Sequence, residues 1–158
     1  MTGVPERRPM LNHTPDAKMN QANFMRTQIY AIMETLKYGM EIMNREKVAI
    51  DRVYGHGGLF KTEGVAQNLL AAAIHAPVTV METAGEGGAW GIAVLAAFRA
   101  LRANGETLED YLNNRVFSGM KQITVHPNPT DEAGFDRYME RFVATIPAQI
   151  AAAKGLKA

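Results

Sequence analysis

The sequence contains no cysteine among its 158 residues. This absence excludes a disulfide framework, a thiolate metal site and a cysteine nucleophile. An excess of charge of either sign is missing too, because 17 Lys and Arg residues stand against 16 Asp and Glu residues. Without a basic surplus, the chain is not expected to bind along a nucleic-acid backbone.

Long apolar runs are also absent. No stretch approaches the ~20 apolar residues of a membrane-spanning helix, and residues 1–8 lack the apolar core of a signal peptide. We therefore expect no membrane association and place the protein in the cytoplasm. The histidines, which are His13, His56, His75 and His126, never fall at the spacing of metal ligands, so no metal site is expected.

The composition is that of a globular protein, with 47% hydrophobic and 21% charged residues. The length fits a single domain with one core. Residues 1–20 contain three prolines among polar residues and are expected to form an extended lead-in. Apolar residues then recur at spacings of three and four, which predicts a helix ending near Asn44 with a buried stripe. The stripe comprises Met25, Ile29, Ile32, Met33, Leu36, Met40 and Met43.

A strand, helix, strand pattern follows. A β-favouring run predicts a strand at about 51–56, which stops at a pair of glycines. Thr62 is the candidate N-cap of a helix that ends before Pro77, and residues 78–82 form the next strand. The residues that this helix is expected to bury are Val65, Leu69, Leu70 and Ile74. A βαβ unit of this kind has parallel strands.

The rest of the chain is predicted to be mostly helical. A Gly-rich segment, residues 83–91, opens a helix that continues to about Asn104. Thr107 is expected to cap a short helix that ends near Asn114, and residues 121–126 are a further candidate strand.

A final helix is expected to begin at Thr130 as its cap and to be kinked or ended by Pro147. Two or three strands cannot cover this many amphipathic helices. We therefore expect an incomplete sheet, completed by strands that precede Met1 in a longer parent protein or by another copy of the chain. The second route predicts a homodimer.

One segment has the position of a ligand-binding loop. It is the run Gly55-His-Gly-Gly-Leu-Phe-Lys-Thr62, between a predicted strand and a predicted helix, where open α/β sheets bind ligands and free N–H groups attract phosphate. The run nearly matches the phosphate-binding loop GxxxxGK[ST], but Phe60 replaces the glycine that lets the backbone wrap a phosphate. The alternative interpretation is a tight turn that simply needs two glycines.

Several motifs occur in a fixed order along the chain. They are Glu6-Arg-Arg-Pro9, Gly57-Gly58, Lys61-Thr62, Gln67, Pro77-Val78-Thr-Val80 and Gly85-Glu-Gly-Gly-Ala-Trp-Gly-Ile-Ala-Val-Leu-Ala96. In this order they resemble the adenosine-binding C-terminal domain of the FGGY family of carbohydrate kinases. The resemblance covers nearly the whole chain, and the Gly-rich motif is most similar to that of ribulokinase-like and xylulokinase-like members.

The resemblance implies an actin-like, ribonuclease-H-like α/β fold. It also implies an ATP-dependent kinase that phosphorylates a sugar hydroxyl, with a pentulose such as ribulose or xylulose as the favoured substrate. The residues implied in contacts with ATP or ADP are Gly57, Gly58, Leu59, Lys61, Thr62 and Gln67. The two glycines would let the backbone lie against adenosine. Lys61 would reach a phosphate or remain a surface residue, and Thr62 would contact adenine or only cap a helix.

Two further roles follow from the resemblance. Gln67 would line the site or only pack in its helix, and the glycines among residues 85–88 would allow close helix packing behind the nucleotide. The family's Asp-x-Gly-Thr phosphate loop and catalytic Asp belong to a portion that precedes this segment, and no Asp-x-Gly-Thr occurs in the chain.

Phosphoryl transfer depends on positioned phosphates, Mg²⁺ and an activated hydroxyl. We therefore expect no catalytic residue in this chain, Mg²⁺ held by the missing domain, and no turnover by the chain alone. The alternative hypothesis is that the chain is not part of an enzyme. The same fold would then be a non-catalytic interaction or oligomerisation module that binds no nucleotide.

Overall fold

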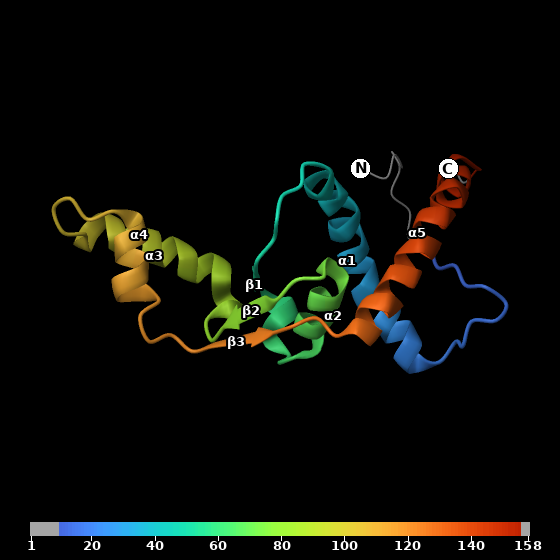
Figure 1. Cartoon of the computed structure of the whole chain (residues 1–158), viewed down its shortest axis with the longest axis horizontal. Coiled ribbons are helices and arrows are strands. Elements are labelled where there is room, and N and C mark those ends of the chain that lie inside the picture. The colour runs from blue at the N-terminus through green and yellow to red at the C-terminus, as the bar shows by residue number, and fades with distance from the viewer. Residues whose placement is uncertain (1–9, 156–158) are drawn as a thin grey trace. The chain divides into compact units, whose positions relative to one another are not determined.

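The computed structural model describes residues 10–155 (Figure 1). In chain order the elements are α1 (Gln21–Arg45), β1 (Val53–Gly55), α2 (Val65–Ile74), β2 (Val78–Met81), α3 (Gly87–Leu101), α4 (Leu108–Tyr111), β3 (Gln122–Val125) and α5 (Pro129–Gly155). Short helical turns also occur, η1 (Gly58–Lys61), η2 (Ala84–Glu86) and η3 (Leu112–Val116). The fold is therefore mixed α/β. It divides into two compact units, one of residues 10–49, 72–75 and 128–155 and one of residues 50–71 and 76–127.

The first unit is built on the contact between α1 and α5, which cross in Figure 1. Tyr30 on α1 meets Phe135 on α5 edge-on, with ring centroids 4.9 Å apart, and meets Tyr138 at 5.0 Å. Tyr30, Met33 and Phe135 are buried. His75, just after α2, lies 3.0 Å from a carboxylate oxygen of Asp136 on α5. Aromatic packing between two long helices thus forms this core.

The bounds predicted for α1 are confirmed, but its predicted buried stripe is wrong. Of that stripe only Met33 is buried, whereas Met25 is 54% exposed and Ile32 is 59% exposed. The reason is that the aromatic side chains of α5 meet α1 at Tyr30, which lies outside the predicted stripe, so most residues of the stripe stay exposed.

The start of α5 also differs from the prediction. The Asn128 side-chain oxygen accepts hydrogen bonds from the backbone N–H groups of Thr130 (2.9 Å) and Asp131 (3.4 Å). Asn128 is therefore the capping residue and Thr130 is not. Pro129 occupies the first helical position, where its missing N–H is harmless. Pro147 lies inside α5 and does not end it.

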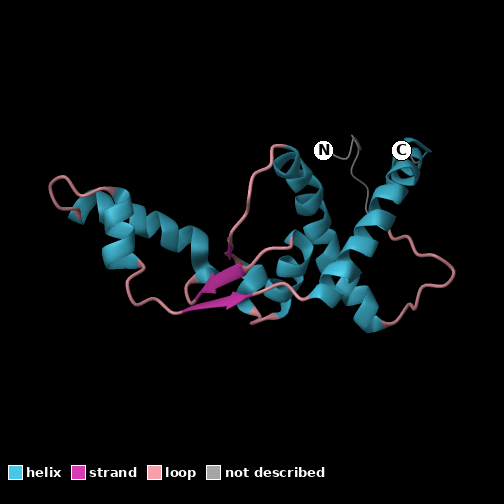
Figure 2. Cartoon of the chain, in the orientation of Figure 1, coloured by secondary structure: helices cyan, strands magenta, loops and turns pink. Residues whose placement is uncertain are grey.

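The second unit contains a three-stranded sheet in the order β1-β2-β3 (Figure 2). β1 and β2 are parallel, as the βαβ pattern predicts, and β3 is antiparallel to β2. Val78 and Thr79 on the central strand are fully buried. The hydroxyls of Thr79 and Thr124 are 2.8 Å apart across the β2–β3 pair. The predicted strand at 121–126 is thus confirmed as β3.

The helix between the parallel strands begins later than predicted. Thr62 has an extended backbone (φ −89°, ψ 107°) at the end of η1, and α2 starts at Val65. The carbonyl of Gly64 accepts the first helical bond, from Asn68 N–H at 2.9 Å. Thr62 is therefore not the N-cap. Leu70 is buried as expected, but Val65 is 47% exposed.

Aromatic rings on α3 contact α4 and the residue that follows η3. Phe98 meets Tyr111 at a centroid distance of 5.4 Å, and Trp90 meets Phe117 at 6.0 Å. Thr107 caps α4 as predicted, because its hydroxyl accepts from the N–H of Asp110 at 3.1 Å. None of the residues of α3 is buried. In the described range no helix is both long and apolar enough to cross a lipid bilayer.

Candidate functional site

Two loops leave the same edge of the sheet. β1 ends at Gly55 and leads through His56 and Gly57 into η1, while β2 ends at Met81 and leads into η2 and α3. Because β1 and β2 are adjacent and parallel, both loops follow the carboxyl ends of their strands. This is the edge at which open α/β sheets bind ligands.

A backbone hydrogen bond joins the two loops. The N–H of Gly57 donates to the carbonyl of Ala84 at 2.7 Å, and η1 packs directly against η2. Gly57 has φ 101° and ψ 177°, a conformation that is essentially restricted to glycine. The carbonyl of Gly57 accepts from Phe60 N–H at 3.1 Å, which closes the turn. The backbone geometry alone therefore requires glycine at position 57.

Phe60 fixes the turn to the end of β1. A Cβ atom on Gly55 would lie 2.7 Å from two carbons of the Phe60 ring, so the ring rests directly on the Gly55 backbone. Gly55 is buried and Phe60 is half-buried. A bulky ring thus fills the place where a phosphate-binding loop would have its glycine.

The phosphate-loop interpretation of this segment is wrong. In such a loop the Lys-Ser/Thr pair opens the helix whose N–H groups cradle the phosphate. Here Lys61 ends η1, Thr62 is extended, and α2 begins only at Val65. The Lys61-Thr62 pair is therefore separated from the first turn of α2.

Side chains of the first loop lie across glycines of the second. A Cβ on Gly85 would meet Cε, Cγ and Cδ of Lys61 at 3.1, 3.3 and 3.8 Å. A Cβ on Gly87 would meet Nδ1 and Cβ of His56 at 3.0 and 3.1 Å. At Gly88 nothing lies within 4 Å. Gly85 and Gly87 therefore make room for two basic side chains of the first loop, which sequence reasoning did not foresee.

The tip of η1 is open. A Cβ on Gly58 would meet no atom within 4 Å, and Leu59 is 38% exposed. Lys61 and Thr62 are exposed as well. Five of the six residues singled out from the sequence, Gly57, Gly58, Leu59, Lys61 and Thr62, thus lie together on one exposed turn.

Gln67 lies apart from this turn, on α2. It is 3% exposed, and its Nε2 donates to the carbonyls of Val78 and Ile123, each at 2.8 Å. Both amide hydrogens are therefore used to join β2 and β3. A buried glutamine with two backbone acceptors could not be recognised from the sequence, because its partners come from two separate strands.

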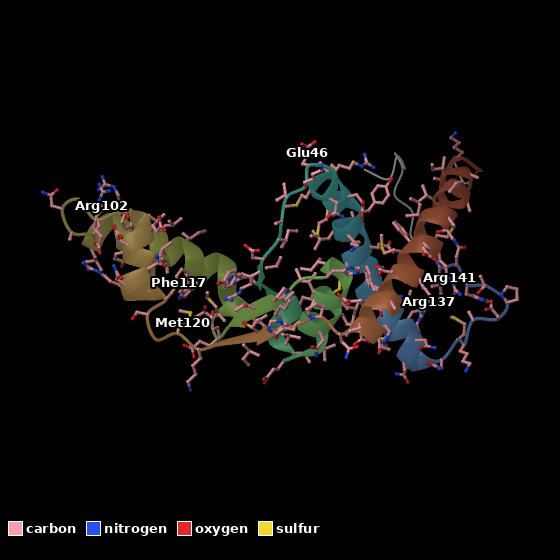
Figure 3. The ribbon with its side chains drawn as sticks, viewed as in Figure 1. Glu46, Arg102, Phe117, Met120, Arg137 and Arg141 are labelled. Carbon is pink, nitrogen blue, oxygen red and sulfur yellow. The ribbon has the colours of Figure 1, made fainter. Side chains whose placement is uncertain are left out.

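The segment before β3 reaches the second loop. The Thr83 hydroxyl donates to Sδ of Met120 at 3.7 Å, and Glu82 N–H donates to the carbonyl of Lys121 at 3.2 Å. Figure 3 labels Met120 and Phe117 between α4 and β3. This support for the second loop comes from a part of the chain to which the sequence analysis assigned no role in the site.

The described residues bring no three histidine, aspartate or glutamate side chains close enough to share a metal ion. The arrangement offers instead the open turn at Gly57 and Gly58, the hydroxyl of Thr62, and the side chain of Lys61 beside Gly85, which lies two residues before α3. Such groups suit a flat, phosphorylated ligand, because exposed backbone permits close approach and a lysine attracts phosphate.

The comparisons with known proteins give one match. Residues 3–100 match the C-terminal domain of the FGGY family of carbohydrate kinases. No curated protein and no solved structure matches the chain. The matched range holds β1, α2, β2 and both loops of the site. The chain therefore belongs to the FGGY family of carbohydrate kinases.

Proposed function

We propose that this chain is the nucleotide-binding domain of an ATP-dependent carbohydrate kinase. The observation that supports the proposal best is the pair of joined glycine turns at the carboxyl ends of adjacent parallel strands, inside the range that matches the family domain. In the parent enzyme the γ-phosphoryl group of ATP passes to a sugar hydroxyl. A pentulose such as ribulose or xylulose is the proposed acceptor, and an actin-like, ribonuclease-H-like arrangement is the proposed fold.

The exposed turn gives each residue a role in this proposal. Adenosine lies over the backbone of Gly57 and Gly58, where a side chain would intrude. Leu59 contacts the base, the Thr62 hydroxyl bonds its edge, and Lys61 reaches the phosphates. Gln67 contributes from behind, by holding together β2 and β3.

The groups that activate the sugar are assigned to another lobe of the parent enzyme. The chain has no Asp-x-Gly-Thr motif, and its described residues hold no metal-ligating cluster. Bound Mg²⁺ would neutralise charge on the phosphates. Closure of two lobes around ATP and sugar would then exclude water from the transfer.

Calorimetric titration with ADP tests the proposal. Gly58→Val adds a side chain at a position with open space around it, so the fold should persist while the nucleotide is blocked. Gly134→Val, on α5, is the matched control, because its Cβ would also meet nothing within 4 Å. We expect saturable binding by the unmodified chain and by the control, and its loss in Gly58→Val. Absence of binding at millimolar ADP would contradict the proposal.

The second candidate function is an association module without nucleotide binding. It is favoured by α3, where residues 87–98 include no charged side chain and where Ile92 is 72% exposed and Leu95 54% exposed. A helix that is apolar all round is normally covered on every side. Light scattering would show a dimer that Ile92→Asp dissociates if this candidate holds, and a monomer at all concentrations would exclude it.

A further inference from the structure

The turn between α3 and α4 contains an asparagine followed by a glycine, Asn104-Gly105. Each of the other asparagines in the sequence is followed by a larger residue. Both residues of the pair are exposed. Gly105 has φ 79°, a conformation that glycine adopts without strain. A Cβ on Gly105 would meet nothing within 4 Å, so the backbone of the turn, not packing, favours glycine there.

Glu106 holds the two ends of this turn together. Its N–H donates to the carbonyl of Ala103 at 3.1 Å, and its Oε2 accepts from the N–H of Ala103 at 2.8 Å. Its other carboxylate oxygen lies 3.1 Å from Nε of Arg115, in η3. The residues on either side of the Asn-Gly pair are therefore anchored to each other and to the segment that follows α4.

The pair at the tip of the turn has no such anchorage. Among the described residues, no hydrogen bond engages the side-chain amide of Asn104 or the N–H of Gly105. By contrast, the side chains of Asn20 and Asn128 accept bonds from N–H groups at the starts of helices. Asn104 thus presents its side-chain amide to water, next to a backbone nitrogen that no Cβ of its own residue shields.

An asparagine in this setting can react with the backbone that follows it. The nitrogen of Gly105 loses its proton and bonds to Cγ of Asn104, the bond from Cγ to the side-chain nitrogen breaks, and ammonia leaves. The product is a five-membered succinimide ring. Water then opens one of the two C–N bonds of the ring, which leaves either aspartate or isoaspartate at position 104. Glycine favours the first step because it puts no side chain in the path of the nitrogen.

We propose that Asn104 is a modification site at which the folded chain deamidates without an enzyme, and that isoaspartate there loosens the turn between α3 and α4. In isoaspartate the main chain runs through the side-chain carbon, which lengthens the backbone between Ala103 and Glu106. Both hydrogen bonds between these two residues depend on the present length of the turn. The new carboxylate also repels that of Glu106. Position 104 lies outside the residues that match the FGGY domain, so the inference is independent of the proposed nucleotide site.

Timed incubation of the full chain in ¹⁸O-labelled water, followed by trypsin digestion and mass spectrometry, tests the inference. Cleavage after Arg102 and Arg115 releases residues 103–115 as one peptide, which also contains Asn113 and Asn114. These two asparagines are exposed and precede larger residues, so they are internal controls. The heavy oxygen distinguishes deamidation during the incubation from deamidation during the digestion.

We expect isoaspartate and aspartate to form at position 104 at least about tenfold faster than at Asn113 or Asn114, because larger side chains follow those two. The rate should rise with pH, since the attacking nitrogen must lose its proton. Gly105→Ala should slow the reaction about tenfold, because the added Cβ obstructs the nitrogen. Asn104→Gln should stop it, because its longer side chain would have to close a larger ring. After incubation, the amide of Glu106 should exchange with deuterium faster in the unmodified chain than in Asn104→Gln.

Several outcomes would overturn the inference. One is product at position 104 in the urea-denatured chain but none in the folded chain, which would show that the fold protects Asn104. Equal rates at the three asparagines would also refute it, and this comparison needs no variant to fold. Unchanged deuterium uptake at Glu106 in a chain that has formed isoaspartate would refute the effect on the turn.

Discussion

Three glycines near the candidate site differ in what the structure demands of them. Gly57 has a backbone conformation that other residues rarely adopt. Gly55 leaves space for the ring of Phe60, which rests on it. Gly58 has neither constraint, since a Cβ there would meet nothing within 4 Å. Substitutions at these three positions should therefore have different consequences for stability.

Gly55→Ala is expected to destabilise the fold by about 1–3 kcal/mol, the usual cost of overpacking. Its Cβ would lie 2.7 Å from the Phe60 ring, and the buried backbone of Gly55 cannot easily move. Urea denaturation measures the loss. Gly58→Ala serves as the control and should stay within about 0.5 kcal/mol. If the Cβ clashes with the Phe60 ring, the variant that combines Gly55→Ala with Phe60→Ala should lose less stability than the sum of the losses in the two single variants.

Gln67→Leu is expected to lower the free energy of unfolding by about 1–3 kcal/mol, because the carbonyls of Val78 and Ile123 would lose a donor. Denaturant titration is again the measurement. Gln28→Leu is the matched control, since Gln28 is exposed on α1. Equal stabilities of Gln67→Leu and the unmodified chain would show that the two hydrogen bonds contribute little.

The turn that carries most of the candidate site residues could be predicted from the sequence, but its contacts with the second loop could not. Paired glycines after a β-favouring run mark the turn, because that signal is local in the sequence. The contact of Lys61 with Gly85 and that of His56 with Gly87 join residues far apart along the chain. Neither has a spacing rule, so only the folded backbone brings them together.

At the scale of elements, the order and type of the helices and strands could be predicted well. Apolar periodicity, glycines and prolines act locally and place α1, β1, β2 and α3 close to their observed bounds. Burial could not be predicted in the same way. An apolar stripe shows which face of a helix prefers to be covered, whereas the neighbouring elements decide whether it is, as the exposed residues of α1 and α3 show.

The contact between α1 and α5 contains a coupled pair of ionisable groups. The Tyr138 hydroxyl donates a hydrogen bond to the Glu34 carboxylate, and both side chains are half-buried. Burial raises the pKa of Glu34, and the bond from Tyr138 partly opposes that rise. Burial, followed by the bond to Glu34, also raises the pKa of Tyr138. The net effect is a raised pKa for both groups, so the folded state favours the protonated form of each.

The raised pKa of Glu34 makes the stability of the chain depend on pH. The folded state binds this proton more tightly than the unfolded state, whose pKa is near the ordinary value of 4.5. The contribution of Glu34 to stability is thus largest below that value and falls as pH rises through the folded pKa. Glu34→Gln, which still accepts from Tyr138, removes this fall. We expect the melting temperature of the variant to gain on that of the unmodified chain between about pH 4 and pH 7. Parallel melting curves across that range would contradict the expectation.

At the scale of the whole molecule, each compact unit is assembled from separate segments. α2 is shared, with residues 65–71 in one unit and 72–75 in the other. The first unit combines the start of the described chain, the end of α2 and all of α5. Neither unit corresponds to a single continuous stretch, so neither can be excised by one cut.

The whole chain is expected to show no sugar kinase activity when purified. It lacks the Asp-x-Gly-Thr motif of the family, and phosphoryl transfer needs a base and metal positioned together with the phosphates. A coupled assay with ATP and either ribulose or xylulose measures this, with an active pentulose kinase as the positive control. Sustained ADP production that depends on the sugar would show that the chain carries its own catalytic groups.

Pro147 gives α5 an internal boundary. Proline has no N–H group, so the carbonyl of Val143, four residues earlier, receives no helical hydrogen bond from it. The rings of Phe135 and Tyr138, which hold α5 against α1, both precede this gap. Beyond it, among the described residues of α5, only the small side chain of Ala153 is buried, so deuterium should enter the amides of the final turns before those around Phe135, in a step of local fraying that leaves the rest of the helix protected.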